Sequence, residues 1–112
     1  QHDFAVVELG TNHFGEISYL SQIAKPDIAA ITLVGPAHLE NLVDLEGVSR
    51  AKGEIFEGLS STGLAILNAD QEQYLPYFKS LLSRNRRVKT IGLNSLADVR
   101  AENVVLDSKQ AP

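Results

Sequence analysis

The stretch Ile28-Ala-Ala-Ile-Thr-Leu-Val-Gly-Pro-Ala-His38 decides the fold class of this chain. It begins with an almost unbroken apolar run, which is typical of a strand buried on both faces of a parallel sheet. Gly35 and Pro36 end the strand. His38 therefore follows the carboxyl end of a strand, at the edge where open α/β sheets bind ligands. A histidine in such a place is either a functional group or an ordinary structural residue.

A similar apolar run, Phe4–Gly10, predicts a second buried strand near the start of the chain. Its one charged residue is Glu8, and a carboxylate inside a buried strand is costly unless it is paired or coordinated to a cation. Glu8 is therefore interpreted either as a ligand-binding residue or as half of a salt bridge to a Lys or Arg at the sheet edge.

The residues between these two runs predict a polar turn, Thr11–Gly15, and a helix over residues 16–24 that ends before a proline. The order strand, helix, strand implies parallel strands joined by a right-handed crossover. Parallel strands have all their carboxyl ends at one edge of the sheet. We therefore expect Asn12 and His13 to lie at the same edge as His38.

An amphipathic helix is predicted from Glu46 to Leu59. Its apolar stripe consists of Val48, Ala51, Ile55, Phe56 and Leu59. Lys52 falls inside this stripe, whereas a lysine that serves solubility lies on the opposite face. Either its aliphatic stem packs inward while the ammonium reaches water, or the side chain points into a site.

In the second half of the chain we expect a third strand at Leu64–Leu67, a helix from Pro76 and a fourth strand at Arg87–Gly92. A weaker edge strand is predicted at Val99–Leu106. Asn68 and Asp70 follow the third strand directly. They either hold a ligand by side-chain hydrogen bonds or, in the case of Asp70, cap the segment that follows.

Composition excludes several classes of function. The net charge is −4, so neither a nucleic acid nor an anionic membrane is predicted as the partner. The chain has no cysteine, which excludes disulfides and thiolate metal sites and is typical of a reducing compartment such as the cytoplasm. No apolar run reaches the length of a transmembrane helix, and no signal peptide is recognised.

Polar side chains thus follow three predicted strands and are expected at one edge of the sheet: Glu8 with Asn12, then His38, then Asn68 with Asp70. A carboxylate near an imidazole suggests a divalent cation. The imidazole taken alone favours zinc or another transition metal over magnesium, which prefers oxygen ligands. The chain contains no phosphate loop of the form Gly-x-x-x-x-Gly-Lys-Ser/Thr.

Four motifs give the chain a resemblance to the central domain of the Mur ligases, over essentially its whole length: Val7–Ile17 (VELGTNHFGEI), Gly35–Leu42 (GPAHLENL), Ala51–Ile55 (AKGEI) and Leu67–Asp70 (LNAD). The most similar branch adds D-alanyl-D-alanine to UDP-N-acetylmuramoyl-tripeptide in peptidoglycan synthesis. The resemblance implies a Rossmann-like, P-loop-type α/β domain, with a mostly parallel sheet flanked by helices. It also implies a cytoplasmic ATP-dependent amide ligase, which forms an acyl phosphate that the incoming amine attacks.

The resemblance also implies roles for individual residues. Glu8 and His38 match residues that bind Mg²⁺, for which Mn²⁺ is a possible substitute. Lys52 matches a lysine that carbon dioxide carbamylates, and together with His38 it is the expected catalytic residue. Carbamylation needs the neutral amine, although a free lysine titrates at about pH 10.4.

Asn68 and, less directly, Asp70 match positions that contact the nucleotide, and Asn12 and His13 match positions near the substrate. One departure concerns Leu33, because many relatives have asparagine there.

We also expect residues 1–112 to be the C-terminal part of a central domain, without the phosphate loop, the N-terminal UDP-binding domain or the C-terminal domain. Such a fragment is expected to have no ligase activity, to bind MgATP poorly and to self-associate through exposed strand edges. The alternatives are a non-catalytic α/β binding module, or another ligase of the Mur or folylpolyglutamate synthase type.

Overall fold

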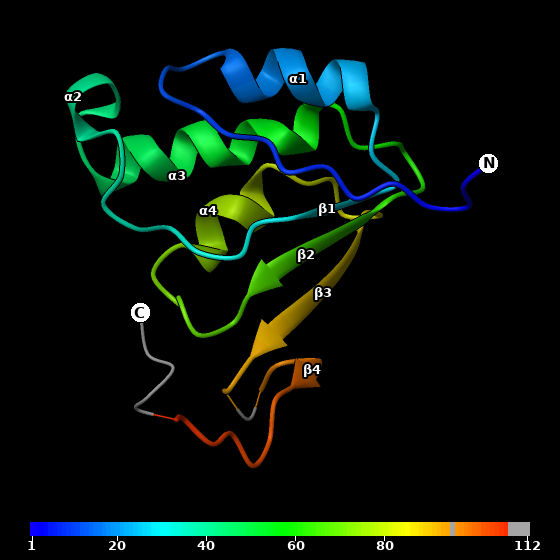
Figure 1. Cartoon of the computed structure of the whole chain (residues 1–112), viewed down its shortest axis with the longest axis vertical. Helices are drawn as coiled ribbons and strands as arrows, with labels where there is room; N and C mark the ends of the chain where they lie inside the picture. The colour runs from blue at the N-terminus through cyan, green and yellow to red at the C-terminus, as the bar shows by residue number, and fades with distance from the viewer. Residues whose placement is uncertain (95, 108–112) are drawn as a thin grey trace.

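The computed structural model describes residues 1–94 and 96–107. Along the chain the elements are α1 (Glu16–Ala24), β1 (Ile28–Ala30), α2 (Leu39–Leu42), α3 (Leu45–Gly53), the 3-10 helix η1 (Glu54–Glu57), β2 (Leu64–Asn68), α4 (Leu75–Ser80), β3 (Arg87–Gly92) and β4 (Val99–Arg100). The strands of this part of the chain form one sheet in the order β1-β2-β3-β4, and each neighbouring pair is parallel (Figure 1). The predicted α/β class with a parallel sheet is confirmed.

The hydrophobic core lies between one face of the sheet and the helices that connect its strands. Ala29 of β1 and Ala65 of β2 belong to the same buried cluster as Val48 of α3 and Phe78 of α4. Side chains of a strand alternate between its two faces. Ile28 is accordingly on the opposite face of the sheet, where it is 59% exposed.

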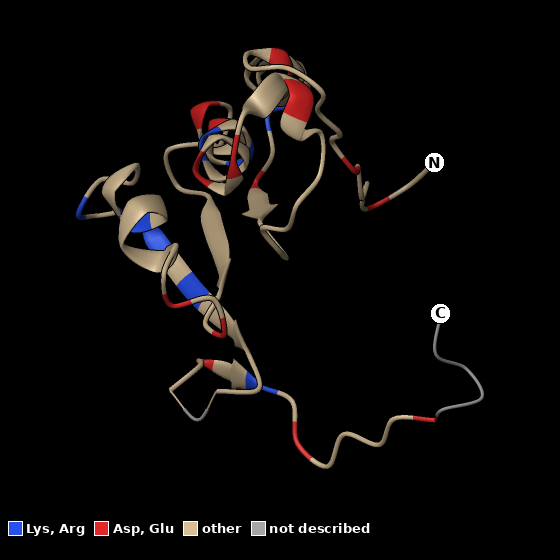
Figure 2. Ribbon diagram, turned by 90° about the vertical axis from the view of Figure 1, so that its left-hand side faces the viewer, with Lys and Arg blue, Asp and Glu red and all other residues tan. Residues whose placement is uncertain are grey.

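Helix α1 packs against η1 and α3 rather than directly on the sheet (Figure 1). The contact is close because Gly58, just after η1, has no side chain: a Cβ there would lie 2.1 Å from the backbone oxygen of Ser21. Ser21 is completely buried, and its hydroxyl donates to the backbone oxygen of Ser18 at 3.1 Å. Acidic residues gather on this α1 and α3 side of the molecule, and basic residues mark α4 and β3 (Figure 2).

The predicted strand Phe4–Gly10 is wrong. Within the described residues this segment joins no strand, and Phe4 and Val6 are 91% and 100% exposed. An apolar run becomes a buried strand only when another strand pairs with it and other layers cover its faces. The segment runs the length of α1 in the opposite direction before the chain turns into that helix (Figure 1).

The other predicted elements are found with changed ends. The helix expected over Glu46–Leu59 is divided into α3 and η1, and the strand expected over Ile28–Val34 pairs regularly only at Ile28–Ala30. Of the edge strand expected at Val99–Leu106, only Val99–Arg100 pairs with β3. Asp98 holds the chain before β4 against β3, because its carboxylate accepts the backbone N–H of Thr90 at 2.9 Å. That hydrogen bond holds the pKa of the Asp98 carboxyl below its ordinary value.

No helix of the described residues combines the length and the apolar character needed to cross a bilayer.

Candidate functional site

Lys52 is placed by a helix whose start is fixed in two ways. The Asp44 side chain caps α3 by accepting the backbone N–H of Gly47 at 2.8 Å. Gly47 also lets α3 approach α2, since a Cβ at that position would lie 1.7 Å from the backbone oxygen of Leu42. Lys52 is half-buried, and in the described part of the chain its ammonium has no hydrogen bond or ion pair.

His38 lies at the start of α2 with an exposed side chain and a left-handed backbone, φ 55° and ψ 34°. This conformation costs a residue with a Cβ about 1–2 kcal/mol. The His38 carbonyl accepts the N–H groups of Asn41 and Leu42 at 3.2 and 3.1 Å, which offsets part of that cost. As predicted, the residue follows the end of the first paired strand.

Asn68 and Asp70 connect the ends of three strands. The Asn68 amide donates to the Thr32 carbonyl at 2.8 Å and accepts the Asp70 N–H at 2.8 Å. The Asp70 carboxylate accepts the N–H groups of Leu93 and Asn94, both at 2.8 Å, so it fixes the loop after β3. Both side chains thus have structural partners, and an amide and a carboxylate each keep further bonding capacity.

Gln71 is a residue that the sequence reasoning missed. Its amide forms a reciprocal pair with the backbone of Val34, accepting the N–H and donating to the carbonyl, each at 2.8 Å. The pair continues the sheet beyond β1 and holds the chain that leads to His38. In the sequence nothing distinguishes Gln71 from the neighbouring polar residues Glu72 and Gln73.

Asn12 and His13 lie in an exposed turn before α1. The Glu16 carboxylate accepts the His13 imidazole N–H (Nδ1) at 2.9 Å and the Asn12 backbone N–H at 3.1 Å. The bond from His13, followed by that from Asn12, holds the pKa of the Glu16 carboxyl below its ordinary value. Thr11 closes the turn by donating its hydroxyl to the His13 carbonyl at 2.8 Å.

Glu8 is exposed, so the argument from a carboxylate buried in a strand does not hold. Neither a salt bridge to Glu8 nor a cluster of three metal-ligating side chains occurs among the described residues. The metal-binding role of Glu8 and His38 stays a prediction from the resemblance.

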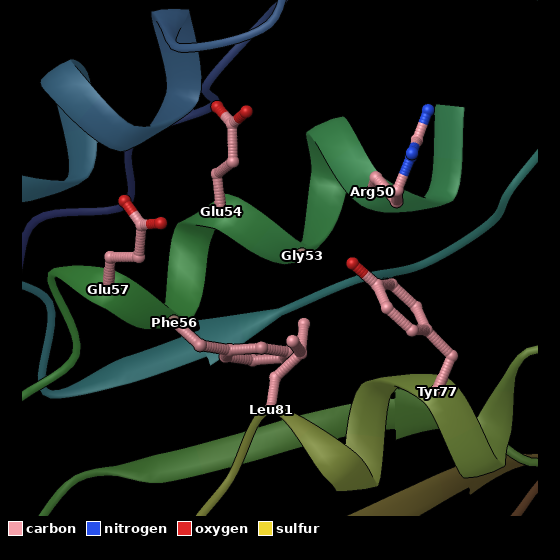
Figure 3. Close-up of a pocket in the computed structure, with 7 residues that line it drawn as sticks. All are labelled: Arg50, Gly53, Glu54, Phe56, Glu57, Tyr77 and Leu81. Carbon is pink, nitrogen blue, oxygen red and sulfur yellow. The ribbon is translucent and has the colours of Figure 1, made fainter. Parts of the chain in front are cut away.

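Two cavities lie near these residues. One, of about 170 Å³, opens between η1 and α4 and is lined by Arg50, Gly53, Glu54, Phe56, Glu57, Tyr77 and Leu81 (Figure 3). Burial raises the pKa of the Tyr77 phenol there. The second, of about 390 Å³, is lined by Asp70, Ile91, Gly92, Leu93, Val99, Arg100 and Ala101. Only the second includes a predicted site residue, namely Asp70.

The structure therefore brings the predicted residues together in two groups. Asn68 and Asp70 share the strand ends with Gln71, and the turn with Asn12 and His13 is tied to Glu54, just after Lys52, by hydrogen bonds to Gly15. In the described residues, no hydrogen bond or ion pair links Glu8 or the His38 side chain to either group.

Comparison with protein families gives a match to the Mur ligase middle domain over residues 1–111. The UDP-N-acetylmuramoyl-tripeptide–D-alanyl-D-alanine ligase of Escherichia coli (strain K12) is 44% identical over 84 residues, which cover 75% of this chain and 19% of that protein. The ligase of the same name from Haemophilus influenzae is 50% identical over 70 residues, or 62% of this chain and 15% of that protein. The chain thus spans about a fifth or less of these relatives.

Solved structures agree with this match. A crystal structure of MurF from Acinetobacter baumannii is similar with a TM-score of 0.77 and 33% identity, covering 94% of this chain and 22% of that one. MurF ligase from Thermotoga maritima in complex with ADP is similar with a TM-score of 0.67 and 26% identity, covering 76% and 19% of the two chains.

Proposed function

The chain belongs to the Mur ligase family, whose middle domain it matches, and from this premise we propose that it is part of a ligase that adds D-alanyl-D-alanine to UDP-N-acetylmuramoyl-tripeptide. Residues 1–112 are then the C-terminal part of the central domain of a longer protein. The observation that carries the proposal is the joint similarity of sequence and fold: 44% identity to a ligase of that name, and a TM-score of 0.77 to MurF.

The reaction has two balanced steps. The terminal carboxylate of the tripeptide attacks the γ-phosphorus of ATP, which forms an acyl phosphate and releases ADP. The amine of D-alanyl-D-alanine then attacks the acyl carbon, the amide bond forms, and phosphate and a proton leave. Because ATP is consumed, the proposed location is the cytoplasm.

The Mg²⁺ ion that the family implies fits the proposed ligands. The Glu8 carboxylate and the His38 imidazole are exposed, and neither has a partner among the described residues. Magnesium is usually bound through one or two carboxylates and completes its shell with waters and nucleotide phosphates, so a cluster of three side chains is not required. When bound, the ion neutralises charge on the transferring phosphoryl group.

Lys52 has the freedom that carbamylation requires. In this reaction the neutral amine forms an N–C bond to carbon dioxide and loses a proton, which gives a carbamate anion. Lys52 is half-buried on α3 and has no hydrogen bond or ion pair among the described residues, which supports this role. A carbamate would add a negative charge to α3, and a negative charge near a cation site favours cation binding.

The nucleotide is proposed to bind beside Asn68 and Asp70. The cavity of about 390 Å³ that Asp70 lines supports this position, as does the similarity to a MurF structure in complex with ADP. Asn12 and His13 are proposed to contact the UDP-linked substrate, because their exposed turn leaves both side chains accessible.

The test is a Lys52→Ala substitution in the full-length ligase. We expect kcat for ADP release to fall about 100-fold or more, because the charge that supports the metal ion at the transferring phosphoryl group is lost. The matched control is Lys79→Ala, at an exposed position of α4, which should leave kcat unchanged. A carbamate signal from ¹³C-labelled bicarbonate should be present in the wild type and absent in Lys52→Ala. Unchanged kcat in Lys52→Ala would refute the assigned role.

A further inference from the structure

Glu54 reaches from η1 to the start of α1. Its two carboxylate oxygens accept the backbone N–H of Gly15 at 3.1 and 2.9 Å, and one of them also accepts the N–H of Ser18 at 3.1 Å. Glu54 and its neighbour Glu57 both point toward the blue ribbon of α1 in Figure 3, away from Tyr77 and Leu81 on the other side of the cavity. A residue 39 positions from Gly15 therefore binds its backbone.

The start of α1 depends on this contact. The first N–H groups of a helix have no partner within the helix, and a side chain of the preceding residue usually accepts one of them. Here the preceding residue is Gly15, with φ 91°, and it provides no side-chain cap. The Glu54 carboxylate replaces that cap, and its negative charge complements the positive end of the helix dipole.

The contact joins two parts of the proposed site. Gly15 ends the Thr11–Gly15 turn that carries Asn12 and His13, and Glu54 follows closely after Lys52. A second contact supports the same connection, because the Arg50 guanidinium of α3 lies over the Phe14 ring, 5.3 Å from its centroid. The turn is thus held to η1 by one glutamate and to α3 by one arginine.

We propose that Glu54 is a positioning residue, which fixes the Thr11–Gly15 turn to η1, directly after the Lys52-bearing helix α3, and so sets the affinity for the UDP-linked substrate. The inference rests on the proposed function, since that function makes the turn a substrate-binding element. Glu54 acts through the backbone of the turn and takes no part in phosphoryl transfer. Loss of the Glu54 carboxylate should therefore raise KM for the UDP-linked substrate rather than lower kcat.

Glu57 provides the matched control. It lies on the same 3-10 helix and points toward the same end of α1, but among the described residues it accepts only the hydroxyl of Ser18. Glu54→Gln and Glu57→Gln remove the same charge from neighbouring positions. Only Glu54→Gln weakens the hydrogen bonds to the backbone of the turn.

The test uses the full-length ligase. With Glu54→Gln we expect KM for UDP-N-acetylmuramoyl-tripeptide to rise about tenfold, because hydrogen bonds to a charged acceptor become weaker bonds to a neutral amide oxygen. KM for ATP and kcat should change less than about twofold. Hydrogen exchange of the amides in residues 11–18 should become about tenfold faster. Glu57→Gln should leave all these quantities close to those of the wild type.

Glu54→Asp is the second variant, which retains the charge on a shorter side chain. It should give a KM between those of the wild type and Glu54→Gln, and it serves as the test if Glu54→Gln does not fold. An unchanged tripeptide KM, or an equal rise in Glu57→Gln, would overturn the inference. A wild-type ligase with no ADP release dependent on D-alanyl-D-alanine would instead refute the proposed function.

Discussion

Two regions of this molecule are rich in apolar residues but differ in how far these residues are buried. The region formed by α2, α3, η1 and α1 contributes apolar side chains to the core, with Leu42 and Ala51 at 0% exposure. The segment 1–10 is also rich in apolar residues, yet Phe4 and Val6 lie almost wholly in solvent. The two regions have a similar share of apolar residues, so composition does not explain the difference in burial. The difference is that helix caps, close glycine contacts and long-range hydrogen bonds hold the first region against other elements, and the second has no such partners among the described residues.

The largest expected effect on stability comes from comparing the addition of one methyl group to the packed region with the same addition to the exposed segment. In Gly58→Ala the new Cβ would lie 2.1 Å from the Ser21 oxygen, so the backbones of η1 and α1 must move apart. We expect the free energy of unfolding to fall by about 2–3 kcal/mol, as for an overpacked core. Urea denaturation measures the change.

Gly10→Ala is the matched control in the exposed segment, where a Cβ would meet no atom of the described residues within 4 Å. Its effect should stay within about 0.5 kcal/mol, as for ordinary surface substitutions. Equal effects of the two substitutions would remove the distinction between the regions.

A smaller effect is expected at Val43, where the packed region contains backbone strain. Val43 lies between α2 and α3 with φ 75° and ψ −60°, and the N–H of Asp44 donates across it to the Leu42 carbonyl at 2.9 Å. This is the rare, strained form of the γ-turn. The Val43 side chain is 74% exposed, so little packing is lost when it is removed.

Val43→Gly should therefore raise the free energy of unfolding by about 1 kcal/mol, since the relief of strain exceeds the added entropy of the unfolded chain. Val7→Gly, in the exposed segment, should give no gain. The midpoint of urea denaturation distinguishes the two variants. A loss of stability in Val43→Gly would show that this turn is not strained.

The smallest effect is expected at Glu16, beside the boundary between the regions. Its carboxyl pKa lies below the ordinary value because of the bonds from His13 and Asn12. A lowered pKa in the folded state gives a contribution that is present above the unfolded pKa and is lost as pH falls through the folded pKa. The stability advantage of the wild type over Glu16→Gln should thus be present at neutral pH and disappear in acid. A difference that grows toward acid pH would contradict the hydrogen bonding described here.

Local patterns in the sequence predicted much of the fold. The predicted helix over residues 16–24 corresponds to α1, and the strand Arg87–Gly92 is found with the predicted ends, because periodicity and punctuation by glycine and proline act over a few residues. The strand at Phe4–Gly10 failed because its burial depends on partners that no local pattern specifies.

The same limit applies to the site. The position of His38 after a strand was predictable from the chain around it. Glu54 and Gln71 were missed, because each acts on a backbone segment at least 36 residues away. Asp70 has one feature of each kind. Its place at a strand end was predicted from the local sequence, and its hydrogen bonds to the loop after β3 were not predicted.

The central claim is that this chain is part of a ligase that joins D-alanyl-D-alanine to UDP-N-acetylmuramoyl-tripeptide. The most direct test is to measure ADP release by the full-length protein with MgATP and the tripeptide, with and without D-alanyl-D-alanine. The account predicts sustained ADP release only when the dipeptide is present, with one amide bond formed per ADP. Release that is independent of the dipeptide, or no release with all three substrates present, would contradict it.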